Sequence, residues 1–368
     1  MNINIQKETL EKPLSQIIGV VEKRQTLPIL ANVYLELTQG TLTLVGSDLE
    51  TEITTRVEDI EGTDGKTTVS ARKLYDICRS LPNESILSLI LEQDHKMIVK
   101  AGKSRFTLQT LNADDYPRLE QTEWTHELQL QQQQLNGLLT KTSFSMAQQD
   151  VRYFLNGLLL EIHNDHVLSV ATDGHRLAKT LINVNPLGIE QVQSIIPRKA
   201  VIETAKFLDS NSEALVNIKL NSSHISIQSG HFIFISKLID GRFPDYEKVI
   251  PAHLDKHVII NRENLINILS RAAILSNEKF RGVSLSVDNN VLQVRSHNPD
   301  QEHAKDEMEV SYEGDPIEIG FNVNYLLEAL KACESKNIDL GLLDPNTSCT
   351  FHAEGSADTL YLIMPMRL

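Results

Sequence analysis

One short segment of the chain has residue types that could form a catalytic or metal site. In Thr172-Asp173-Gly174-His175-Arg176-Leu177, a carboxylate stands two residues before an imidazole, and an Asp–His pair can serve a hydrolase as orienting group and general base. However, side chains at i and i+2 of a glycine-containing turn need not face each other, and no Ser or Cys nucleophile motif accompanies them. Further His or Cys ligands at the spacing of a zinc site are absent. We therefore predict no catalytic residue, no metal and no cofactor; a hydrolase using Asp173 and His175 is the alternative, and a structural turn is the simplest reading.

Bulk composition narrows the class of protein. The 368 residues are 41% hydrophobic and 23% charged, which argues against disorder. The three cysteines, Cys78, Cys333 and Cys349, are too few for a disulfide framework, and we expect Cys78 and Cys333 to be small buried side chains. No signal-peptide pattern is visible, and no apolar run approaches the roughly 20 residues of a membrane span. The sequence predicts a soluble, cytoplasmic protein.

The segment around Asp173 belongs to a pattern that occurs three times. Ser47-Asp48, Thr172-Asp173 and His297-Asn298 each follow an alternating apolar run, and positions 48, 173 and 298 are 125 residues apart. Repeats of this length predict three similar domains rather than a short-period solenoid.

Two further registers support the repeat. Residues 71–74 correspond to 197–200 and, more faintly, to 322–325. Residues 105–111 correspond to 232–238, and the last segment, 360–368, occupies the same place in the third copy. We expect domains over residues 1–120, 128–250 and 251–368.

Each copy combines two amphipathic helical stripes with several short strands, and hairpin signals such as Ser229-Gly230 and Asp288-Asn289-Asn290 lie between strands. This pattern predicts an α+β fold with two helices on an antiparallel sheet in each copy. The expected helices cover residues 7–22, 71–81, 131–146, 197–209, 262–275 and 323–334.

Charge is unevenly divided between these helices and the rest of the chain. The six segments contain twelve basic and nine acidic residues, a net charge of +3. Because the whole chain carries −14, the remaining residues carry a net charge of −17. If the helices share one face, that face is mildly basic on an acidic body. Chance partition among solvated helix faces is the alternative.

Several longer stretches carry a resemblance to a known family. They are residues 26–30 (TLPIL), 149–157 (QDVRYFLNG), 171–178 (ATDGHRLA), 240–246 (DGRFPDY), 272–283 (AAILSNEKFRGV) and 364–368 (MPMRL). Together they resemble the bacterial DNA polymerase III β subunit, the replicative sliding clamp, over the whole chain.

The resemblance implies three tandem DNA-clamp domains per subunit and a head-to-tail homodimeric ring with helices lining the hole. It implies a processivity factor without catalysis, which encircles double-stranded DNA independently of sequence. The implied protein partners are the DNA polymerase III catalytic subunit, the clamp loader and other clamp-binding proteins that carry short linear peptides. A mildly basic lining would attract phosphates without fixing a register, so such a ring could slide.

The resemblance also implies a pocket for partner peptides. Its residues would be Arg152, Leu155, Thr172, Gly174, His175, Arg176, Leu177, Pro244, Lys248, Val249, Leu362, Ile363, Met364, Pro365, Met366, Arg367 and Leu368. Aliphatic and thioether side chains rimmed by Arg and His suit an extended peptide with hydrophobic anchors. Lys248 stands where the family has Arg, which removes a planar fork. An inward-packed edge strand is the alternative for the last segment.

Direct DNA contacts are implied for Arg24, Arg72, Lys73, Gln149, Tyr153, Phe154, Arg198 and Lys199. Phe154 stands where relatives often have Tyr, so stacking could remain but a hydroxyl contact is lost. The alternative for the basic residues is a solvated helix start or a salt bridge.

The subunit interface would join the first copy to the third. Its implied members are Lys73, Lys103, Arg105, Phe106, Leu108, Ile274, Leu275, Asp300 and Glu302. An apolar centre with a charged rim is usual interface anatomy. The alternative for Phe106 is a place in the core of its own domain.

Overall fold

The computed structural model describes residues 1–21, 27–92, 95–119 and 123–367. Two predicted site residues, Arg24 and Leu368, lie outside these ranges. The chain divides into two compact units, one of Met1–Gln133 with Glu203–Leu238, the other of Gln134–Ile202 with Ile239–Leu368. The division passes through helices α3 (Gln132–Thr140) and α4 (Arg198–Phe207), so the middle repeat contributes to both units.

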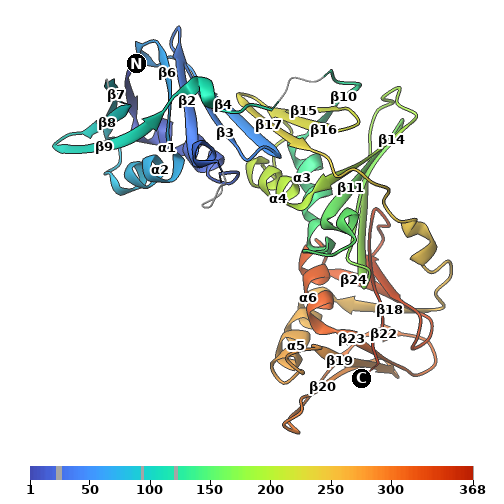
Figure 1. Cartoon of the computed structure of the whole chain (residues 1–368). Helices are drawn as coiled ribbons and strands as arrows, with labels where there is room; N and C mark the ends of the chain where they lie inside the picture. Colours follow the sequence, from blue (N-terminus) through green and yellow to red (C-terminus); the bar gives the residue numbers. More distant parts are fainter. Residues whose placement is uncertain (22–26, 93–94, 120–122, 368) are drawn as a thin grey trace. The chain divides into compact units, whose positions relative to one another are not determined.

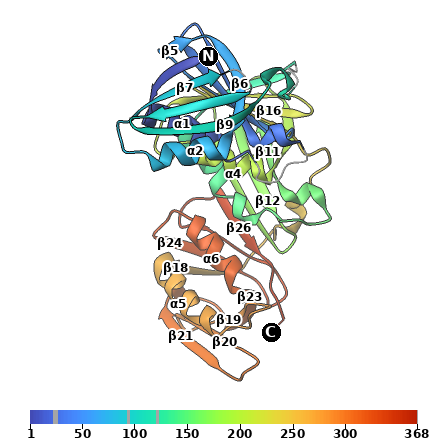
Figure 2. The ribbon, with the colours of Figure 1, turned by 60° about the vertical axis from the view of Figure 1, so that its left-hand side comes forward.

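The first unit is built on one antiparallel sheet, which has 13 strands among the described residues. In sheet order the strands are β10 (His126–Gln131), β15 (Leu215–Leu220), β16 (His224–Ser229), β17 (Phe232–Lys237), β4 (Thr51–Val57), β3 (Thr41–Ser47), β2 (Asn32–Thr38), β6 (Gly65–Ser70), β9 (Ser104–Leu111), β8 (Lys96–Ala101), β7 (Ile86–Glu92), β1 (Asn2–Gln6) and β5 (Glu61–Thr63). Helices α1 (Lys7–Ile17) and α2 (Ala71–Ser80) lie side by side on one side of these strands (Figures 1 and 2).

The second unit contains sheets of nine and four strands in its described part. The larger is ordered β14 (Gln191–Pro197), β11 (Gly157–His163), β12 (His166–Thr172), β13 (Arg176–Asn183), β26 (Thr359–Ile363), β25 (Cys349–Ala353), β24 (Asn337–Leu342), β18 (Lys256–Asn261) and β22 (Ser311–Tyr312). The smaller is ordered β21 (His303–Glu309), β20 (Val291–His297), β19 (Gly282–Asp288) and β23 (Ile317–Asn322). Helices α5 (Arg262–Ile274) and α6 (Val323–Ala332) pack against each other.

Short 3₁₀ helices connect several of these elements. They are η1 (Pro28–Ala31), η2 (Ala113–Asp115), η3 (Ser143–Ser145), η4 (Tyr153–Asn156) and η5 (Tyr246–Val249).

All six expected helices are present in the described residues; each is shorter than predicted, four by one to three residues and two by more. The segment predicted over 131–146 ends as α3 at Thr140, and the Thr142 hydroxyl donates to the Leu138 carbonyl at 2.8 Å. Thr and Ser side chains compete in this way for backbone acceptors, which favours the 3₁₀ turn η3 over a further α-turn. The segment predicted over 7–22 ends as α1 at Ile17 and keeps Pro13 inside it.

Equivalent strands of successive copies join edge to edge at two places. In the first unit β4 pairs with β17, with Ile53 opposite Phe234. In the second unit β13 pairs with β26, with Ala178 opposite Tyr361. Both joins are antiparallel. In each, the strand that follows the Asp48 or Asp173 turn of one copy pairs with the last strand of the next copy.

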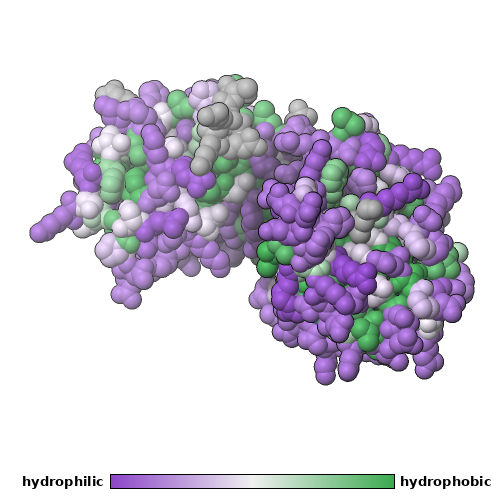
Figure 3. Space-filling view, turned by 90° about the horizontal axis from the view of Figure 1, so that it is seen from below, coloured by the Kyte–Doolittle hydropathy of each residue, from purple (hydrophilic) through white to green (hydrophobic). Residues whose placement is uncertain are grey.

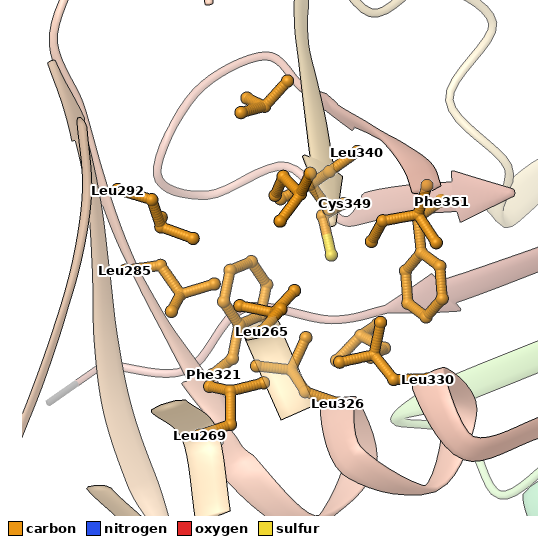
Figure 4. Packing of buried hydrophobic residues seen from close by; sticks show 14 of the residues in the cluster. Leu265, Leu269, Leu285, Leu292, Phe321, Leu326, Leu330, Leu340, Cys349 and Phe351 are labelled. Atoms are coloured by element: carbon orange, nitrogen blue, oxygen red, sulfur yellow. The ribbon is translucent and has the colours of Figure 1, made fainter. Parts of the chain in front are cut away.

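The cores follow the predicted alternation. In the second unit, Leu265, Leu269 and Leu326 from α5 and α6 surround Phe321 of β23, as Figure 4 shows. The predicted hairpins form, and Asn289 and Asn290 have positive φ of 48° and 63°, as tight two-residue turns favour. All three cysteines are buried thiols, so the prediction for Cys78 and Cys333 is confirmed.

The surface is largely polar. On the face seen in Figure 3, hydrophilic side chains predominate and hydrophobic ones form smaller separate areas. Among the described residues, no helix combines the length and apolar character that crossing a bilayer requires.

Candidate functional site

The Asp173–His175 segment forms a turn in which the carboxylate bonds to the backbone. Asp173 Oδ1 accepts the amides of His175 at 2.9 Å and of Arg176 at 3.1 Å. Thr172 Oγ1 accepts the Gly174 amide at 3.1 Å and donates to the Arg176 carbonyl at 2.6 Å. The carboxylate therefore shapes the turn that connects β12 to β13, and it bonds to the amide of His175 rather than to its ring.

The same turn occurs in the first copy, where Asp48 Oδ1 accepts the amides of Glu50 at 2.9 Å and Thr51 at 2.6 Å. Because the first copy has no histidine in this turn, the shared aspartate shapes the backbone and does not form a dyad with histidine. In the described part of the chain, no three His, Cys, Asp or Glu side chains are arranged to hold a metal ion.

Arg176 ties this turn to the third copy. Its Nε donates to Asp173 Oδ2 at 3.0 Å and its Nη2 to the Phe144 carbonyl at 2.7 Å, and its Nη1 pairs with Glu328 of α6. The guanidinium also lies over the rings of Tyr325, 4.5 Å from the centroid, and Phe144, 5.4 Å away. With only 10% of its side chain exposed, Arg176 is a supporting residue of the site.

Arg152 supports the other side of the turn. Its Nη2 donates to the Asp173 carbonyl at 3.1 Å, and it forms an ion pair with Asp150 at 2.8 Å. That hydrogen bond lowers the pKa of Asp150 to about 2. Gly174 has φ of +91°, and a Cβ there would come within 2.9 Å of the Arg152 guanidinium. Glycine at this position therefore permits both the turn and the close approach of Arg152.

The segment after β26 runs along the turn. Leu362 pairs with Leu177 in the sheet, and the Met364 amide donates to the His175 carbonyl at 2.9 Å. The Met366 amide donates to the Gly320 carbonyl at 2.8 Å. Residues 362–366 are thus brought beside residues 172–177, although nearly 190 positions separate them in the sequence.

An apolar cluster lies beneath this region. Leu155, Leu177 and Leu362 are each at most 2% exposed and share a core with Phe243 and Tyr246, against which Met364 packs. Ile363, which was predicted with them, belongs instead to the core of the third copy. Successive residues of a strand face opposite sides of the sheet, so Leu362 and Ile363 cannot both face the cluster.

Residues 244–249 border the same cluster through their buried neighbours. Phe243 and Tyr246 are 8% and 7% exposed, whereas Pro244, Lys248 and Val249 are exposed. Lys248 Nζ lies 2.7 Å from Asp245. Predicted pocket residues from three distant segments therefore contribute to or adjoin one apolar cluster, whereas Met366 bonds to Gly320 of β23.

Next to the turn lies a cleft of about 500 Å³. Its lining includes seven residues that sequence reasoning assigned to no site, namely Phe144, Met146, Ala147, Gln148, Asp150, Tyr325 and Glu328. Tyr325 and Glu328 stand three apart on α6, and this spacing marks one helix face. The sequence does not indicate that this face meets Arg176.

The residues predicted to contact DNA fall into two groups. Arg72 and Lys73 are exposed in the first turn of α2. In the second unit, Gln149 and Tyr153 are exposed, and Phe154 packs against the apolar cluster. Arg198 donates to the Met146 carbonyl at 3.2 Å and lines the cleft, so it supports the loop that precedes Gln149. Lys199 is half-buried beside it at the start of α4.

The predicted interface residues lie on strand edges and helix ends of both units. On β9, Leu108 is 8% exposed, Phe106 is half-buried, and Arg105 pairs with Glu92 at 3.6 Å. Lys103 is exposed in the preceding turn. Ile274 is 77% exposed at the end of α5, and Leu275 is half-buried. Asp300 and Glu302 are exposed just before β21.

These features describe three tandem α+β domains with edge-joined sheets and a surface site between the second and third copies. Family models of the DNA polymerase III beta subunit match the chain with its N-terminal domain at residues 1–120, its central domain at 129–245 and its C-terminal domain at 247–367. The chain belongs to the DNA polymerase III beta subunit family.

Relatives match over their full length. The chain is 46% identical to the "Beta sliding clamp" of Pseudomonas aeruginosa and 44% identical to that of Escherichia coli K12, with 100% of each chain covered. The crystal structure of the Pseudomonas aeruginosa sliding clamp bound to griselimycin superposes with a TM-score of 0.95 at 46% identity, again with 100% of both chains covered.

Proposed function

We propose that this protein is a sliding clamp: a homodimeric ring that encircles duplex DNA and tethers the replicative polymerase and other enzymes to it, without catalysis of its own. Work on chromosomal DNA would place it in the cytoplasm. The observation that carries the proposal is the strand join that occurs twice within the chain. The corresponding strands of the first and third repeats can form such a join only with a second molecule of the chain.

The strands needed for the third join have open edges. In the described residues β21, the counterpart of β4 and β13, pairs only with β20. On β9, the counterpart of β17 and β26, residues 104–109 pair within the described part of the chain with β8 alone, and β6 pairs there with only the last two residues of β9. Joining β21 of one copy to β9 of another would satisfy both edges and continue each sheet.

The two internal joins also predict the register. Ala178 opposes Tyr361, and Ile53 opposes Phe234. The hairpin closed by His297 and His303 makes Ala304 the counterpart of Ala178. The hairpins closed by Ala101–Ser104 and Ser229–Phe232 make Phe106 the counterpart of Phe234, which shifts the alignment of 105–111 with 232–238 by one residue. Phe106 of one copy should therefore oppose Ala304 of the other.

Because the strands would be antiparallel, moving two residues forward on β9 and two residues back from Ala304 places Leu108 opposite Glu302. Lys103 then lies opposite Glu307, which adds an attractive pair to the predicted charged rim.

The partner-peptide pocket is proposed at the site between the second and third copies. An apolar floor of Leu155, Leu177 and Leu362 with Met364 beside it can take a hydrophobic anchor, and exposed His175 and Arg152 can hold a polar group. The related sliding clamp of Pseudomonas aeruginosa has been crystallised with griselimycin bound.

DNA contact is proposed for the exposed Arg72 and Lys73, for Gln149, Tyr153 and Lys199, and for Arg24. Sequence-independent attraction to phosphates needs cations without a preset register. The acidic remainder of the chain would disfavour binding of DNA elsewhere.

The test is topological. The protein is loaded onto a nicked circular plasmid by a bacterial clamp loader and separated from free protein at high salt. Retention on the circle followed by rapid loss after a restriction enzyme linearises it is expected. Equal retention on circular and linear DNA would contradict encirclement, and a purified-protein hydrolase activity abolished by Asp173→Asn or His175→Gln would favour the alternative.

A further inference from the structure

A second cleft, of about 370 Å³, borders residues 242–247 and contains titratable side chains that the proposed function does not use. At its base lies Glu161 of β11, which is 4% exposed. Burying a carboxylate is costly unless the surrounding groups donate hydrogen bonds to it.

Three side chains reach the Glu161 carboxylate. Gln193 Nε2 donates to Oε1 at 2.5 Å. The Tyr246 hydroxyl and His163 Nε2 both approach the other oxygen, Oε2, and each lies 3.4 Å from it. Because both of these contacts are long, a small shift of Oε2 toward one group weakens its bond to the other.

Tyr246 links Glu161 to the proposed partner pocket. It opens η5, whose exposed Lys248 and Val249 belong to the predicted pocket wall. Its ring packs in the apolar cluster with Leu155 and Leu177. Burial, with the Glu161 charge adding to it, raises the pKa of Tyr246, so the hydroxyl remains a donor.

His163 stacks on His166 across the β11–β12 hairpin, with centroids 4.3 Å apart and ring planes at 14°. His166 Nδ1 lies 2.7 Å from Asp165. The other charged groups facing this cleft are Lys179, Arg242, Asp245 and Glu247, and Lys179 Nζ lies 5.4 Å from the Tyr246 ring centroid.

We propose that Glu161 is a positioning residue that holds η5 in place through Tyr246, and that protonation of His163 weakens this hold and lowers the affinity for partner peptides. The proposal rests on the partner pocket proposed above. An imidazolium attracts Oε2 more strongly than a neutral ring does, so the carboxylate moves toward His163 and away from the tyrosine hydroxyl. The wall that carries Lys248 and Val249 then loses its polar anchor.

The experiment measures griselimycin affinity of the full-length protein by calorimetry between pH 8.0 and pH 5.5. The wild type should lose affinity by about threefold or more across the range in which histidines ordinarily titrate, near pH 6.5. Glu161→Gln and His163→Gln should each remove most of this dependence. Glu161→Gln should also bind more weakly at pH 8.0, because an amide oxygen is a poorer acceptor than a carboxylate.

A matched control is His257→Gln, since His257 makes a comparable contact with Asp339, at 3.0 Å, between β18 and β24. This variant should keep the wild-type pH profile. The exposed His175 is present in every protein compared, so a difference between their pH profiles does not come from it. If Glu161→Gln fails to fold, His163→Gln carries the comparison.

Identical pH profiles in the wild type and His163→Gln would overturn the inference while leaving the pocket proposal intact. Absence of griselimycin binding at every pH would instead overturn the proposed pocket, so the two failures are distinguishable.

Discussion

The guanidinium of Arg176 lies 4.5 Å from the ring centroid of Tyr325, so Arg176 of the second copy contacts helix α6 of the third copy. Arg176 also forms ion pairs with Asp173 of its own turn and with Glu328 of α6. The turn that borders the candidate pocket is therefore stabilised from α6, far from it in sequence.

Replacing Arg176 with Met should destabilise the second unit by about 2–3 kcal/mol, because Asp173 and the Phe144 carbonyl lose a buried donor. Chemical denaturation followed by circular dichroism measures the change. The control is Arg152→Met, whose ion pair with Asp150 is half exposed and whose loss should therefore cost much less than that of Arg176. Equal losses in the two variants would contradict the role assigned to Arg176.

Replacing Ile274 and Leu275 with Ala should weaken dimerisation more than it lowers the stability of the chain, in which Leu275 is already half-buried. Ile274 is 77% exposed, so its side chain gains burial only on association. We expect the dimer dissociation constant to rise about thirtyfold or more, or about 2 kcal/mol. Sedimentation at nanomolar concentration measures it, with Leu215→Ala, 59% exposed on β15, as control. A double variant that stays fully dimeric would place the interface elsewhere.

Deleting Met364–Leu368 should abolish one wall of the pocket and spare the helices. The Met364 and Met366 amides would no longer bond to His175 and Gly320. Binding of polymerase or clamp-loader peptides should fall tenfold or more, which corresponds to about 1.4 kcal/mol. Fluorescence anisotropy with labelled peptide tests this, and retention on circular DNA should be unchanged. Normal peptide binding by the truncated protein would move the site.

The Asp150–Arg152 pair should contribute to stability in a pH-dependent way. The folded-state pKa of Asp150 is lowered to about 2 by its hydrogen bond with Arg152. A depressed carboxyl pKa gives stability that is present above the ordinary value of about 3.9 and is lost as pH falls toward about 2. The difference in unfolding free energy between wild type and Asp150→Asn should therefore shrink between pH 4 and pH 2. A difference independent of pH would exclude this linkage.

The repeat and its helices could be predicted because periodicity is a local property. Leu74 and Cys78, four apart in sequence, are both buried in α2 as their spacing indicates. The end of α3 could not be predicted, since the Thr142 hydroxyl competes with the backbone only once Leu138 is in place.

The candidate site was only partly predictable for a related reason. The resemblance identifies Leu155, Leu177 and Leu362, and they do share one core. Strand alternation implies that Leu362 and Ile363 face opposite sides of the sheet. Which of the two faces the cluster, and that Glu328 pairs with Arg176, depends on strand pairing and on contacts between distant segments.

Joining unlike edges has a consequence for assembly size. A contact between β21 and β9 is heterologous, so every added copy presents a fresh β21 or β9 edge until the two ends meet. Closure then depends on the rotation between successive copies, and a different twist would yield open filaments. A change in that rotation would therefore convert a finite particle into a polymer while every individual contact is retained.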